Sequence, residues 1–130
     1  MQDRFKFRVF LKYNQIMCDI DSYCFLQGIN KCVFHFTNGS QKTLKNDDFI
    51  LMQCTGLKDK NGKLIYEGDI VKTIYTKPDG VIINRNCVIE YNRSAFWINY
   101  GIAASYLYND DCIYEVIGNR YENPKLLEVE

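Results

Sequence analysis

Apolar and polar residues alternate most clearly near the start of this chain. In residues 5–13 aromatic and aliphatic residues hold the odd positions, and charged residues hold the even positions except at Phe10. A period of two is the period of a β-strand with one face on a core. No long segment keeps the 3.6-residue period of a helix. The pattern therefore predicts a mainly β protein.

The stretch Phe49–Val71, FILMQCTGLKDKNGKLIYEGDIV, organises the rest of the chain. Its two apolar runs flank a polar segment that contains Asn61 and Gly62, two residues that tolerate the positive φ of a tight hairpin turn. Gly68 and Asp69 then form a tight corner before a third apolar run. The stretch predicts strand, turn, strand, corner and strand, with these four residues in structural roles.

Other segments also have the composition of strands. Residues 21–31 and 101–111 are difficult to interpret and are expected to be loops. Asn123 and Pro124 suit the cap and first position of a helix, so we expect a short C-terminal helix over about 123–128. Further strands are expected at Ile16–Ile20, Cys32–Phe36, Gln41–Leu44, Val81–Tyr91 with an interruption near Asn84–Asn86, Ala95–Tyr100 and Cys112–Ile117.

The length of the chain and the corner at Gly68 together indicate a single domain with a small β-barrel. A chain of 130 residues suffices for one domain with a real core and is short for two. The Gly-Asp-hydrophobic-Val corner resembles the first strand of many small SH3-like barrels, which is an analogy of fold alone. We expect one domain over 1–130, in which N-terminal strands (about 1–48) pack on an SH3-like β-barrel (about 49–118).

The charge balance bears on partners. Sixteen basic and sixteen acidic residues cancel, so the chain lacks the electrostatic footprint of non-specific nucleic-acid binding. No apolar run is long enough to span a membrane, and the N-terminus lacks the apolar core of a signal peptide. We therefore expect no membrane partner and a cytoplasmic location.

Six cysteines and one histidine are the candidates for metal or redox chemistry. Without a secretion signal we interpret the cysteines as reduced, core-packing residues. Zinc sites favour ligands two to four residues apart, and Cys18, Cys24, Cys32 and His35 are spaced too widely for that pattern. No phosphate-binding loop or nucleophile motif occurs either. The sequence predicts no metal, no cofactor and no catalytic residues.

Two groups of residues are candidates for an interaction surface. Lys58, Lys60 and Lys63 lie in the polar segment, where they form either a solvated turn, the favoured interpretation, or a contact to phosphates. Aromatic residues of the C-terminal half could form a second core, anchor a protein interface or stack on bases. The candidates among them are Trp97, Tyr106 and Tyr108.

Three motifs, in order along the chain, resemble the YopX family of bacteriophages and prophages of Gram-positive bacteria. Residues Leu51–Lys72, LMQCTGLKDKNGKLIYEGDIVK, resemble the family signature. The opening FKFRVF (Phe5–Phe10) and the ending YEVIGNRYENPKLLE (Tyr114–Glu128) resemble its usual start and close. The resemblance implies a β-rich fold, a mobile-element origin and action inside a bacterial host. It supplies no catalytic set.

Three function classes follow. We favour a non-enzymatic, phage-derived accessory or interaction module that binds a host or phage protein, or itself as a homo-oligomer. The alternative is a nucleic-acid-associated accessory factor that uses the lysines and the aromatic residues. An enzyme is the least favoured class, because sixteen acids always offer carboxylate pairs but nothing selects one.

Overall fold

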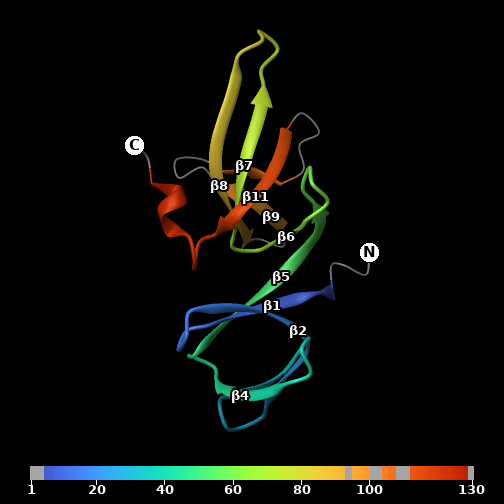
Figure 1. Ribbon diagram of the computed structural model, residues 1–130, viewed down its shortest axis with the longest axis vertical. Helices are drawn as coiled ribbons and strands as arrows, with labels where there is room; N and C mark the ends of the chain where they lie inside the picture. The colour runs from blue at the N-terminus through green and yellow to red at the C-terminus, as the bar shows by residue number, and fades with distance from the viewer. Residues whose placement is uncertain (1–4, 93–94, 100–103, 108–111, 129–130) are drawn as a thin grey trace. The chain divides into compact units, whose positions relative to one another are not determined.

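The computed structural model is mainly β, as predicted (Figure 1). It describes residues 5–92, 95–99, 104–107 and 112–128. Within these ranges, one 3-10 turn is the only helical element that spans several residues. No helix in the described residues is long and apolar enough to cross a membrane. The chain divides into two compact units, residues 1–54 and 55–130. That these units form one domain stays a prediction.

The first unit is an antiparallel sheet in the order β4-β3-β2-β1-β5. Its core is aromatic and aliphatic, and Phe34 packs edge-on against Phe49 with ring centroids 4.7 Å apart. Strand β5 begins in this unit and ends in the second. The strands are β1 (Phe7–Leu11), β2 (Ile16–Leu26), β3 (Lys31–Phe36), β4 (Gln41–Lys45) and β5 (Phe49–Lys58).

Strand β1 departs from the expected pattern of one buried and one exposed face. Val9 and Leu11 lie in the core, but Arg8 and Phe10 on the opposite face are also only 8% and 4% exposed. Strand β1 lies between β2 and β5, so both of its edges are also paired. Phe10, which broke the alternation in the sequence, is thus a buried residue of the second face.

Two strands differ from the sequence prediction. Strand β2 continues past Ile20 to Leu26, into the segment expected to be a loop. A bulge between Ile20 and Ser22 shifts its register, and the ring centroids of Tyr23 and Phe7 lie 5.2 Å apart. The expected interruption near Asn84–Asn86 is also wrong. Those residues pair continuously with β7, so the whole segment from Ile82 is one strand.

The second unit contains the end of β5 and a five-stranded antiparallel sheet in the order β10-β9-β8-β7-β11. The SH3-like barrel is not confirmed, because the strands that the structure describes form an open sheet with β10 and β11 at its edges. Strand β6 pairs with β5. The strands are β6 (Leu64–Tyr66), β7 (Asp69–Thr76), β8 (Ile82–Asn92), β9 (Ala95–Asn99), β10 (Ala104–Tyr106) and β11 (Cys112–Asn119).

The C-terminal helix is not confirmed as an α-helix. Pro124–Leu127 form a single 3-10 turn, η2, and the Asn123 side chain makes no capping hydrogen bond to it. Instead, the Oδ1 atom of Asn123 accepts a hydrogen bond from the Asn119 N–H at 3.2 Å. Asn86 on β8 donates its side-chain N–H to Leu126 O at 2.9 Å, which holds the turn beside the sheet.

Close packing at Gly118 gives the first testable prediction. A Cβ at this position would lie 2.6 Å from Asn123 Oδ1 and 3.0 Å from Leu126 Cδ1. We expect Gly118→Ala to lower the free energy of unfolding by about 1–2 kcal/mol in urea titrations, the usual cost of overpacking. Adding Asn123→Ala should recover part of this loss. Equal stability of Gly118→Ala and the wild type would contradict the packing argument.

Candidate functional site

The polar segment 58–63, here called the tongue, is built on a buried carboxylate. Asp59 is 8% exposed. Its Oδ1 atom accepts hydrogen bonds from the N–H groups of Asn61 and Lys63, both at 2.9 Å. Its Oδ2 atom accepts the N–H of Val116 on β11, also at 2.9 Å. One side chain therefore closes the turn and ties it to a strand distant in sequence.

Backbone bonds complete the tongue. The Asp59 N–H donates to Lys63 O at 2.8 Å, and the Gly62 N–H donates to Asp59 O at 3.0 Å. Of the Asn61-Gly62 pair, Gly62 has the positive φ, 82°. A turn that closes on a left-handed glycine is a common three-residue hairpin connection. The tongue thus has a fixed shape, which also fixes the backbone of its lysines.

The pKa of Asp59 supports a structural role. Burial alone would raise it, but the backbone N–H donors of Val116, Lys63 and Asn61, with the charge of Lys63, outweigh burial and hold the pKa below its ordinary value. The carboxylate is therefore ionised at neutral pH, and three N–H groups occupy its oxygens.

The three candidate lysines of the tongue are all exposed, but an acidic side chain lies beside them. The Nζ atom of Lys60 lies 3.5 Å from Glu115 Oε2, and the Asn61 side chain donates to the same oxygen at 3.4 Å. A carboxylate from β11 thus lies among the cations and reduces the local positive charge. Lys58 and Lys63 are the remaining lysines of the tongue.

Trp97 on β9 is one of the predicted interaction residues. Its side chain is half-buried, and the indole N–H donates to Asn92 O at 2.8 Å. The β9–β10 register places residue 106 opposite Trp97. The side chain of Tyr106 and all of Tyr108 lie outside what the structure describes. Whether these three residues form an interaction surface therefore stays a prediction.

The corner at Gly68 and Asp69 is buried and internally bonded. Gly68 has a φ of 86°, and its N–H donates to Ile89 O at 2.8 Å. Its carbonyl accepts the Arg120 N–H at 2.9 Å. Asp69, 2% exposed, accepts the Tyr66 N–H at 2.8 Å. The corner joins three segments of the second unit by backbone bonds.

An apolar surface that the sequence analysis missed lies on the outer face of β7, β8 and β11. Ile74 pairs with Ile113 across β7 and β11, and Ile82 pairs with Thr76 across β8 and β7. Directly paired and alternate residues point to the same face. Ile82 and Ile113 are 66% and 52% exposed. We call Ile74, Ile82 and Ile113 the outer patch.

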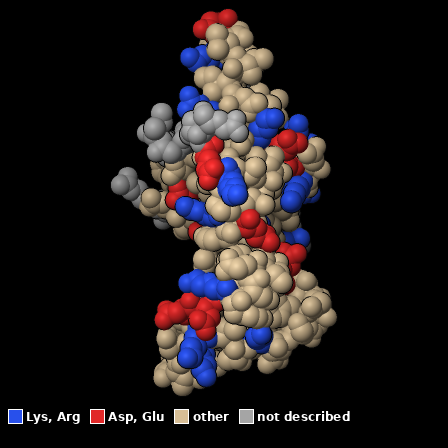
Figure 2. All heavy atoms as spheres, turned by 60° about the vertical axis from the view of Figure 1, so that its left-hand side comes forward, with Lys and Arg blue, Asp and Glu red and all other residues tan. Residues whose placement is uncertain are grey.

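Charged residues border the outer patch. Lys72 lies opposite Glu115 in the β7–β11 register, on the same face as Ile74, and Lys60 contacts Glu115 from the tongue. Both signs of charge are therefore present at this edge, with Lys60 paired to Glu115 and Lys72 on the neighbouring strand. Elsewhere acidic and basic side chains are interspersed over the face that Figure 2 shows, without a broad region of one sign.

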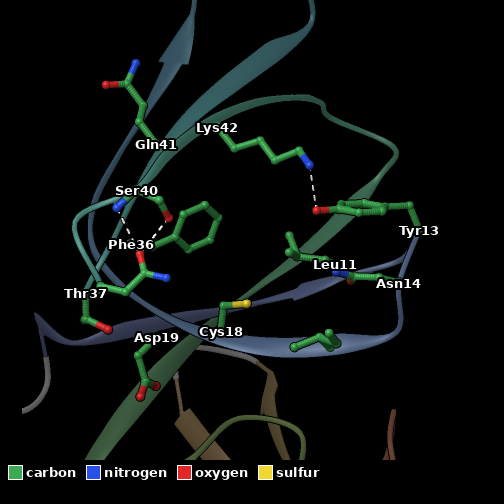
Figure 3. A pocket seen from close by; sticks show the side chains of 12 residues that line it. Leu11, Tyr13, Asn14, Cys18, Asp19, Phe36, Thr37, Ser40, Gln41 and Lys42 are labelled. Atoms are coloured by element: carbon green, nitrogen blue, oxygen red, sulfur yellow. Dashed lines mark hydrogen bonds between the residues drawn. The ribbon is translucent and has the colours of Figure 1, made fainter.

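The first unit has a pocket of about 490 Å³ between the β1–β2 turn, β3 and β4. Leu11 and Phe36, both core residues, form part of its floor. Figure 3 shows the ends of the Lys42 and Tyr13 side chains next to each other at one end of the opening, with a hydrogen bond of 2.6 Å from Lys42 Nζ to Tyr13 Oη. The sequence offered no signal for this pair, because 29 residues separate its members.

All six cysteines are free, and Cys32, Cys54 and Cys87 are buried. Burial raises the pKa of the Cys32 and Cys87 thiols, so both are neutral at pH 7. Among the residues that the structure describes, no three His, Cys, Asp or Glu side chains lie together as metal ligands.

Comparison with known proteins identifies the family. The chain belongs to the YopX family, whose model, described as YopX protein, matches residues 6–128. No curated protein matches the chain.

Solved structures resemble the chain over nearly its whole length. Protein EF1440 from Enterococcus faecalis is 29% identical, with a TM-score of 0.61 over 95% of this chain and 97% of that protein. Protein yopX from Bacillus subtilis is 20% identical, with a TM-score of 0.68 over 98% of both chains. The second likeness, at its low identity, shows the fold alone.

Proposed function

We propose that this protein is a non-enzymatic accessory module of phage or prophage origin that acts inside a bacterial host cell by binding another protein. The observation that carries the proposal is the outer patch. Two isoleucines more than half exposed, with Ile74 between them, lie on one face of the paired strands β11, β7 and β8. A grouped apolar surface of this kind is typical of an interaction site, whereas single exposed apolar residues are not.

The border of the patch indicates the chemistry of the partner. Lys60 is ion-paired with Glu115 beside the isoleucines, and Lys72 lies opposite Glu115 in the strand register. A partner with apolar side chains at the centre and an acidic residue at the rim would complement this arrangement. Burial of each exposed isoleucine contributes on the order of 1–2 kcal/mol to such a contact. The β7–β8 hairpin, which projects from the sheet in Figure 1, supplies Ile82.

The nucleic-acid alternative has weaker support. It depends on the tongue lysines, and Lys60 is paired with Glu115. The chain carries zero formal net charge, and basic and acidic side chains mix on the surface in Figure 2. Backbone contacts to nucleic acid require clustered cations and weaken steeply with salt. A salt-dependent mobility shift with DNA or RNA that is lost on Lys58→Gln/Lys63→Gln would favour this alternative.

The outer patch makes a prediction about binding in cells. The tagged double variant Ile82→Asn/Ile113→Asn should lose a protein that the wild type captures from its host, with recovery reduced about tenfold or more. Both side chains are solvent-exposed, so the variant should keep its fold. The matched control is Ile29→Asn, which changes an isoleucine 56% exposed in the other unit.

The same variants distinguish a foreign partner from a second copy. If the partner is the chain itself, light scattering should show a mass above 15.3 kDa for the wild type and for Ile29→Asn, and the monomer mass for the double variant. Capture and mass that are both unaffected by the double change would contradict the outer patch as the binding surface.

A further inference from the structure

The pocket of the first unit combines an apolar floor with a polar rim. Its floor continues the core of the unit through Leu11 and Phe36, which are 4% and 8% exposed, and adds Ile16 and Cys18. A volume of about 490 Å³ lies in the range of small-molecule sites, roughly 300–1,000 Å³. The cavity thus has the size and the apolar surface to take the body of a small ligand.

The rim of the pocket is rich in hydrogen-bond donors. The Lys42 ammonium has three N–H donors and gives one of them to Tyr13 Oη at 2.6 Å. The Tyr13 hydroxyl accepts this bond and keeps its own O–H as a donor. The two groups lie side by side at one end of the opening in Figure 3. They can therefore donate together to one acceptor group.

The opposite part of the rim adds to this preference. Asn38 Oδ1 accepts hydrogen bonds from the Ser40 N–H at 2.9 Å and the Ser40 hydroxyl at 2.6 Å, which leaves the Asn38 amide N–H₂ as a donor. Among the lining residues, which the structure describes in full, Asp19 carries the only carboxylate. Figure 3 shows it pointing away from Lys42. The end of the opening at Lys42 is therefore positive and rich in donors.

We propose that this pocket binds a small amphipathic carboxylate. The apolar body of the ligand would lie on Leu11, Ile16 and Phe36, and its two carboxylate oxygens would accept from Lys42 Nζ and Tyr13 Oη. A planar carboxylate offers two acceptor oxygens to two adjacent donors, one of them charged, which is the stronger class of hydrogen bond. This site is separate from the outer patch and does not depend on the proposed protein partner.

The test uses the full chain with octanoate, 1-octanol and acetate as probes. Calorimetry measures the affinity of each probe, and amide chemical-shift mapping locates where it binds. Octanoate should bind in the pocket more tightly than 1-octanol, and acetate should show no measurable binding. Lys42→Met should weaken octanoate about tenfold or more and leave 1-octanol unchanged. Lys45→Met, an exposed lysine on the same strand outside the pocket, is the matched control and should change nothing.

A second variant tests the apolar floor. Ile16 is 48% exposed, so Ile16→Asn should fold, and it should weaken octanoate and 1-octanol alike. Equal affinity for octanoate and 1-octanol, or octanoate affinity unchanged by Lys42→Met, would overturn the role of the charged rim. Absence of saturable octanoate binding, or shifts confined to residues outside the pocket, would overturn the site itself.

Discussion

Asp59→Ala should lower the free energy of unfolding by about 3–4 kcal/mol, the largest effect expected for a polar side chain of this protein. The change removes the acceptor of three backbone N–H groups, those of Asn61, Lys63 and Val116, while the site stays mostly buried. Each buried donor left without a partner costs about 1–3 kcal/mol, and partial hydration of the exposed tongue limits the sum. Urea titration followed by tryptophan fluorescence measures the effect.

Asp79→Ala is the matched control. Asp79 accepts the Val81 N–H at 2.9 Å in the β7–β8 turn. This site is exposed, and the prediction concerns one backbone N–H there instead of three. Its loss should cost less than about 1 kcal/mol, since water replaces the acceptor. If Asp59→Ala and Asp79→Ala had equal effects, Asp59 would not be the link between the tongue and β11.

Asp59→Asn separates charge from shape. The amide oxygen can still accept from Asn61 and Lys63, but the amide nitrogen would face the Val116 N–H, so we expect a loss of about 1–2 kcal/mol. The pH dependence should also change. Because the folded pKa of Asp59 is lowered, its stabilisation is complete above the unfolded value of about 4 and is lost as pH falls through the folded pKa. Below pH about 4 the wild type should therefore lose stability more steeply than Asp59→Asn.

Gly68→Val should destabilise the protein by about 3 kcal/mol. Gly68 has a φ of 86°, a conformation that costs a β-branched residue about 1–3 kcal/mol. The residue is also buried, and its N–H and C=O both bond to other segments, which limits relaxation. The melting temperature and the urea midpoint should both fall.

Gly80→Val isolates the backbone contribution to this effect. Gly80 has a similar φ of 88°, lies in an exposed turn, and a Cβ there would meet nothing within 4 Å. It should cost about 1–2 kcal/mol, which is the strain without the packing term. A Gly68→Val variant no less stable than Gly80→Val would contradict the importance of the buried corner.

Local chemistry made much of this fold predictable. Alternation in residues 5–13 located β1, and glycines with neighbouring polar residues located the hairpin turn at Gly62 and the corner at Gly68, both of which have positive φ. These signals depend on a few adjacent residues, so a single sequence contains them. The resemblance to the YopX family added that the opening, the central stretch and the ending belong to one β-rich family fold.

Features that depend on distant partners were not predictable. The bulge after Ile20 extends β2, and no local motif marks it. Asp59 looks like an ordinary turn residue, yet its partner Val116 lies 57 residues away. The outer patch depends on the β7–β11 register, which places Ile113 beside Ile74. Strand pairing decides these three features, and alternation within one strand does not specify the neighbour.

The most direct test of protein binding by the outer patch is photo-crosslinking in host cells. A photoreactive phenylalanine analogue would replace Ile82 in one variant. In a second variant it would replace Ile29, an exposed isoleucine of the other unit. The account predicts a discrete protein adduct from position 82, absent from position 29 and abolished when Ile113→Asn is added. Identical products from both positions, or no protein adduct from position 82, would contradict it.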